Sequence, residues 1–292
     1  MERPVQKSLQ EYARGIAGGL LFSLPLIYTM EVWWAGFTSH PMRLFFYVVV
    51  TFALLIGYNQ FAGLRHDASF TEVVIDSVEE LGLGLLISSA MLLLLRRVSF
   101  DMTTGEIVGK IVIEAMPVAI GVSVGTAQLG GGDGKSNDTG AGGSRRSKRK
   151  RGEKVGEKDL EHFGGQMVIA LCGAVLFAAN VAPTEEVVQL ASEISSWHLL
   201  GVALVSISLG ALVLFYSDFT CAERLAPAEG VFAVIIGTII TYAVALMASA
   251  LILWFFGRFE GVAWITIIAE TVVLGLAATL GASAGRLLLQ AQ

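Results

Sequence analysis

Eight long apolar blocks, separated by short polar connections, dominate the chain. Each block is continuously apolar and close to the ~20 residues that a helix needs to cross a bilayer, whereas a barrel strand would need only ~10. The blocks predict eight transmembrane helices at about Gly15–Trp34, Met42–Gly63, Glu72–Leu95, Glu106–Leu129, Phe163–Ala182, Trp197–Tyr216, Glu229–Phe256 and Gly261–Leu288. Pro25 and Glu31 interrupt the first block. Without that block, seven spans remain and the two termini lie on opposite sides of the membrane.

The composition agrees with this pattern. Of the 292 residues, 54% are hydrophobic and only 15% are charged, whereas soluble domains have ~25% charged residues. The two cysteines, Cys172 and Cys221, imply no disulfide framework. No cleavage site follows the first block, so we expect it to be retained as a signal anchor. The fold class predicted is all-α, a polytopic transmembrane helix bundle.

A basic stretch at residues 130–162 divides the chain. It is rich in Gly, Ser, Lys and Arg and has too few apolar residues to form a core, so we expect a disordered cytoplasmic linker. The first membrane half is then residues 1–129, with four spans, and the second is residues 163–292, with the other four. With eight spans, most Lys and Arg residues lie on the side of the linker and both termini, which is therefore the cytoplasmic side.

The two halves resemble each other in sequence. Thr29 falls on Thr184 at an offset of 155 residues, and Glu114 falls on Glu270 at an offset of 156. Further matches at offsets of 156 to 158 are Ile111 with Ile267, Gly125 with Gly281, Tyr58 with Tyr216, Phe61 with Phe219 and His40 with His198. Each half has an even number of spans, so a duplication would give parallel repeats related by an axis along the membrane normal.

Acidic residues within or beside the spans are the main chemical signal. A carboxylate in hydrocarbon costs ~2.5–3.5 kcal/mol even on the lenient insertion scale, so such residues need a reason. The candidates are Glu31, Asp76, Glu79, Glu80, Glu114, Glu185, Glu186 and Glu270. They cover both membrane entrances, and Lys110 is the one Lys or Arg residue in a predicted span away from the span's ends. Protons or cations such as Ca²⁺ or Mg²⁺ would then neutralise most of these acids.

Structural alternatives exist for several of the acids. The spacing of Glu106, Lys110 and Glu114 permits a ladder of ion pairs, in which Lys110 pairs with Glu114. If so, Lys110→Met should harm folding unless Glu114 is neutralised too. Glu185 and Glu186 follow Pro183 and Thr184, as acids in the first turn of an ordinary helix do. Glu31 could lie at the lipid headgroups.

Two stretches resemble an uncharacterised bacterial family of integral membrane proteins with about seven predicted spans, a domain of unknown function. They are Asp76-Ser-Val-Glu79-Glu80-Leu-Gly-Leu-Gly84 and Asn180-Val-Ala-Pro-Thr-Glu-Glu186. The resemblance implies a bacterial inner membrane location and a possible small partner subunit, but no activity. Cation/calcium exchangers also use duplicated acidic helices. Their halves are inverted, however, and carry a Gly-Asn acidic motif, whereas Ala179 precedes Asn180 here.

Two classes of function follow. The first is a cation transporter or channel that uses intramembrane carboxylates, with the cation as substrate and no cofactor. The second is a membrane scaffold or sensor that acts with a partner subunit or as a homo-oligomer. The chain has no H-E-x-x-H or G-x-S-x-G motif and no cysteine cluster, so we expect no enzyme. The basic run Arg145–Arg151 is suited to anionic lipid headgroups, not to nucleic acid.

Overall fold

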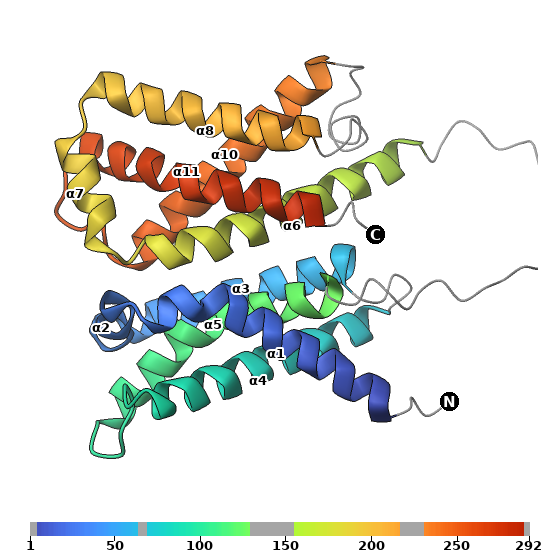
Figure 1. Ribbon diagram of the computed structural model, residues 1–292, viewed down its shortest axis with the longest axis vertical. Helices are drawn as coiled ribbons and strands as arrows, with labels where there is room; N and C mark the ends of the chain where they lie inside the picture. The colour runs from blue at the N-terminus through green and yellow to red at the C-terminus, as the bar shows by residue number, and fades with distance from the viewer. Residues whose placement is uncertain (1–4, 64–68, 129–154, 217–230, 289–292) are drawn as a thin grey trace, which may run out of the picture.

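The computed structural model describes residues 5–63, 69–128, 155–216 and 231–288, and Figure 1 shows their arrangement. These residues form the helices α1 (Val5–Ile27), α2 (Met30–Thr38), α3 (Pro41–Ala62), α4 (Phe70–Leu94), α5 (Thr104–Gln128), α6 (Val155–Val181), α7 (Glu185–Glu193), α8 (Ser196–Tyr216), α10 (Val231–Phe255) and α11 (Trp264–Leu288). The helical prediction is confirmed for this part of the chain.

Seven of the described helices are long and apolar enough to cross a membrane: α3, α4, α5, α6, α8, α10 and α11. The eight predicted spans are thus approximate: the first block does not qualify as one span, although α1 runs between the same two ends of the molecule as the qualifying helices (Figure 1). The block Gly15–Trp34 is not a single helix, because the chain turns between Ile27 and Met30 and divides it into α1 and α2. Helix α1 contains Glu11 and Arg14, which lower its apolar character, yet it still packs along α5.

The two halves have the same order of helices and the same packing. Helices α1 to α5 form one bundle, and α6 to α11 form a second bundle beside it (Figure 1). Every main helix pair of the first bundle has its counterpart in the second: α1/α5 with α6/α11, α2/α5 with α7/α11, α3/α5 with α8/α11, α4/α5 with α10/α11, α3/α4 with α8/α10 and α1/α4 with α6/α10. The short helices α2 and α7, which were not predicted as separate elements, lie at the same end of the molecule.

Glycines allow the closest helix crossing in each bundle. A Cβ placed on Gly18 of α1 would lie 2.5 Å from the Cα of Gly125 in α5. In the second bundle, a Cβ on Gly173 of α6 would lie 2.2 Å from the carbonyl oxygen of Gly281 in α11. Any side chain at these positions would collide with backbone, so the crossings require glycine.

The ends of α4 and α10 have the same geometry. Each helix is followed by a residue with positive φ, Arg96 at 56° and Gly257 at 74°. The amide of the next residue, Arg97 or Arg258, donates to the carbonyl five residues earlier at 2.8 and 3.0 Å, as in a Schellman motif. Arg97 and Arg258 are thus equivalent, and they align α4 with α10 at an offset of 161 residues.

The two bundles meet mainly where α3 and α5 pack against α6, and where α3 approaches α10. Tyr47 of α3 stacks on Phe255 of α10 with ring centroids 4.1 Å apart. Beyond them, Arg43 forms an ion pair with Glu260. Two cavities lie at this junction, one of about 100 Å³ lined in part by Tyr47 and one of about 70 Å³ lined in part by Tyr58.

The predicted linker differs from the structure at its C-terminal end. Helix α6 begins at Val155, so residues 155–162 are helical and extend the first span of the second half. Residues 130–154 of the linker, including Arg145–Arg151, lie outside the described residues.

Candidate functional site

Two buried carboxyls occupy equivalent positions in the central helices of the two bundles. Glu114 of α5 and Glu270 of α11 are both 0% exposed. Within the described structure, none of their four carboxyl oxygens has a hydrogen-bond partner. Buried polar atoms are nearly always hydrogen-bonded in native proteins, so this matched pair of carboxyls is the candidate functional site.

The surroundings of the two carboxyls are aromatic or basic. The Trp33 indole of α2 lies near Glu114 but is not within hydrogen-bond geometry, and its Nε1 also lacks a partner among the described residues. Tyr47 lies within electrostatic range of Glu114, and Arg258 within range of Glu270. Neither carboxyl is accessible to solvent.

Lys110 does not pair with Glu114. Its ammonium group donates to Glu106 at 2.8 Å and to the carbonyl of Arg97 at 3.2 Å, and it lies 5.5 Å from the Phe37 ring centre. The predicted ladder of ion pairs is therefore wrong for the pair Lys110 and Glu114. The flexible Lys110 side chain turns toward the N-terminal end of α5, where the α4–α5 connection supplies acceptors.

This geometry changes which second substitution is expected to offset the loss of stability in Lys110→Met. We expect the substitution to lower the free energy of unfolding by about 1–3 kcal/mol, because it leaves Glu106 and the Arg97 carbonyl without their donor. Adding Glu106→Gln should recover part of the loss, whereas adding Glu114→Gln should not. Thermal unfolding of the single and double variants measures both couplings. If Glu114→Gln rescues Lys110→Met and Glu106→Gln does not, Lys110 pairs with Glu114 as the sequence had suggested.

Glu80 of α4 lies in a hydrogen-bonded polar cluster inside the first bundle. Its Oε2 accepts from Asn59 Nδ2 of α3 at 2.7 Å, and the same nitrogen lies 3.1 Å from Ser77 Oγ. Ser123 of α5 donates to Asn59 Oδ1 at 3.0 Å. All four side chains are buried. Glu80 thus has the donors that Glu114 lacks.

The second bundle has hydroxyl groups at three equivalent places. At the 161-residue offset, Ser77 corresponds to Thr238 and Glu80 to Thr241, and at 156 residues Ser123 corresponds to Thr279. Thr238, Thr241 and Thr279 are all buried. The sequence comparison missed this correspondence because α4 and α10 align only through Arg97 and Arg258. The second bundle therefore retains a polar interior without the carboxyl.

The three candidate acids of α4, Asp76, Glu79 and Glu80, do not share one environment, although their spacing had suggested that they would. Glu80 is buried, Asp76 is half-buried and Glu79 is exposed. Successive residues in a helix are separated by about 100°, so Glu79 and Glu80 point to different sides although both neighbour Asp76. Glu80 faces the bundle interior and Glu79 faces away from it.

The other predicted acids lie at helix starts. Glu31 is half-buried in the first turn of α2, and Glu185 and Glu186 are exposed in the first turn of α7. Both positions match the favourable placement of acids at helix N-termini. Within the described parts of the chain, no three His, Cys, Asp or Glu side chains lie close enough together to hold one metal ion.

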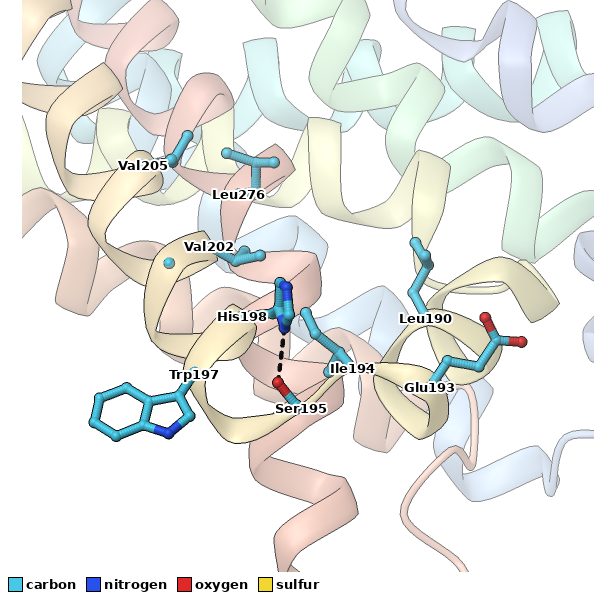
Figure 2. Close-up of a pocket in the computed structure, with 10 residues that line it drawn as sticks. Leu190, Glu193, Ile194, Ser195, Trp197, His198, Val202, Val205 and Leu276 are labelled. Carbon is cyan, nitrogen blue, oxygen red and sulfur yellow. Dashed lines mark hydrogen bonds between the residues drawn. The ribbon is translucent and has the colours of Figure 1, made fainter.

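A pocket of about 750 Å³ lies where α7 meets α8, next to α11 (Figure 2). Its lining is mostly apolar, but it includes Ser195 and His198, whose Oγ and Nδ1 atoms lie 2.7 Å apart. The sequence-matched His40 instead accepts from the Met42 amide at 3.2 Å and caps α3. The two histidines therefore differ in role, and neither lies with the buried carboxyls.

The fold and the buried carboxyls define a polytopic α-helical membrane protein built from two similar bundles. Residues 11–289 match the model of a family described as "Putative integral membrane protein (DUF2391)", and the chain belongs to this family. In the same comparisons, no curated protein and no solved structure matches the chain.

Proposed function

We propose that this protein moves cations across the membrane, that the cation is the proton, and that Glu114 and Glu270 bind it. The observation that carries the proposal is the matched pair of buried carboxyls whose four oxygens lack partners among the described residues. A carboxylate buried in this way is costly, and binding of a proton removes the cost.

The donor set favours the proton over a metal ion. A metal such as Ca²⁺ takes six to eight oxygen ligands, and Mg²⁺ requires octahedral coordination. The described residues bring no such set of acids together at Glu114 or Glu270.

The junction between the bundles offers a route for the proton. Tyr47 lies within electrostatic range of Glu114 and lines the cavity of about 100 Å³, while Tyr58 lies within electrostatic range of Glu80 and lines the cavity of about 70 Å³. Each tyrosine thus lies near a carboxyl of the first bundle and beside a cavity at the junction. Glu80, which accepts a hydrogen bond from Asn59, would relay the proton toward the other membrane face.

For the orientation, we propose cytoplasmic termini and a cytoplasmic basic linker in the bacterial inner membrane. The support is the excess of Lys and Arg in these segments. Helix α1 begins and α11 ends at the same end of the molecule, opposite α2 and α7 (Figure 1). Reporter fusions within residues 130–154 and after Gln292 should both be cytoplasmic. A periplasmic signal from either fusion would contradict this orientation.

Purified protein in lipid vesicles tests the function. A potassium gradient with valinomycin sets the membrane potential, and a trapped pH dye records proton entry. We expect proton flux above that of empty vesicles, and no flux of Ca²⁺, Mg²⁺ or Na⁺ with the matching dyes. Flux of a metal ion instead of protons would overturn the choice of ion. If no ion passes, the protein is a scaffold or sensor, the alternative class.

A further inference from the structure

Helix α4 carries a carboxyl on the side that faces away from the rest of the protein. Glu79 is exposed, and its exposed neighbours on the same helix include Ile75, Val78 and Leu86. Glu79 lies about 14 Å along α4 from Phe70, which is within the ~30 Å hydrocarbon core if α4 spans it. No described side chain forms an ion pair with Glu79.

The equivalent face of α10 shows what a lipid-facing surface of this fold looks like. At the 161-residue offset fixed by the two helix ends, Ile240 occupies the place of Glu79. The exposed residues around it are Ile235, Ile236, Ile239 and Ala243, all of them apolar. The carboxyl of Glu79 is therefore a departure from the lipid-facing pattern that the second bundle keeps.

We infer that this face of α4 binds a transmembrane helix of another protein, and that this helix carries a Lys or Arg at the depth of Glu79. The partner's charge would neutralise a carboxylate that lipid cannot solvate. Gly82, one turn from Glu79, has nothing within 4 Å of the position of a Cβ, so a second helix can approach the backbone closely there. Helix α4 lies at the edge of the first bundle, where such a helix has access (Figure 1).

A second copy of this chain fits the surface less well. In the helices that qualify as spans within the described residues, Lys110 is the one basic side chain away from the helix ends, and it is buried. Two copies related by a two-fold axis would also place Glu79 against Glu79. Charge complementarity therefore favours a different chain with a basic intramembrane residue.

Synthetic transmembrane helices test the inference directly. Two Leu/Ala peptides are prepared that differ only in a Lys or a Leu at the central position. Energy transfer between labelled peptide and labelled protein measures binding in vesicles. We expect the Lys peptide to bind about tenfold more tightly than the Leu peptide, and this difference to vanish in Glu79→Gln. The control Val78→Gln, which changes an exposed neighbour, should keep the preference.

Glu79→Gln alters an exposed side chain and should leave the fold intact, which circular dichroism can check. Three results would contradict the inference. Equal binding of the two peptides to the wild type would overturn the inference. So would a Lys preference that survives in Glu79→Gln. Efficient disulfide formation between copies of Gly82→Cys, with the native cysteines replaced by Ser, would show that a second copy occupies the face instead. None of these results depends on whether the protein transports protons.

Discussion

Replacing Glu114 and Glu270 together by Gln is expected to reduce proton flux in vesicles to the level of empty vesicles. The amide keeps the size of the carboxyl but cannot take up and release a proton in the physiological range. Removal of a proton-transfer group typically costs a factor of about 100 or more, so each single variant should already be strongly impaired. The measurement is initial flux at a fixed membrane potential, normalised to folded protein.

The same variants separate transport from structure. The four oxygens at these two sites have no partner among the described residues, so a neutral amide strands no buried charge, and folded yield should be unchanged. Glu186→Gln is the matched control, because Glu186 is an exposed acid at the start of α7. It should retain normal flux. Normal flux in the double Gln variant would refute the assignment, and a loss of folded protein would indicate structural carboxyls.

The largest effect on stability is expected at the glycine crossings. A Leu at Gly281 would meet the Gly173 carbonyl oxygen, which lies 2.3 Å from the position of a Cβ and cannot move without shifting α6. Extra methylenes in a core that can adjust cost about 1–3 kcal/mol, and here backbone must be displaced instead. We expect Gly281→Leu, and equally Gly125→Leu in the first bundle, to abolish folded yield.

Gly201 of α8 provides the control for these substitutions. Nothing lies within 4 Å of a Cβ placed there, so Gly201→Leu should fold normally. Size-exclusion profiles and thermal unfolding in detergent measure the difference. If Gly281→Leu folds as well as Gly201→Leu, the close packing of α6 on α11 does not contribute to stability as described.

The apolar pattern predicted most of the fold because lipid imposes it directly. Continuous blocks of about 20 residues gave the spans from α3 to α11, and the matches at Glu114 and Gly125 located the equivalent helices of the two halves. The pattern did not separate α1 from α2. A single apolar run contains no signal for the turn between Ile27 and Met30 apart from Pro25.

The site was harder to predict because it depends on which side of a helix faces the interior. Sequence spacing grouped Glu79 with Glu80, but only packing against α3 and α5 shows that Glu80 is buried and Glu79 is not. Spacing also permitted Lys110 to reach Glu114. The position of the Arg97 carbonyl, which decides the matter, comes from the end of α4 and cannot be read from α5 alone.

Infrared spectra of the wild type and of the Glu114→Gln, Glu270→Gln double variant, recorded across a pH series, test most directly whether these two carboxyls bind protons. The wild type should show a carboxylic-acid C=O band that changes with pH and shifts on exchange into heavy water. This band should be absent from the double variant. Spectra in which the two proteins share the same carboxylic-acid bands at every pH would contradict proton binding at Glu114 and Glu270.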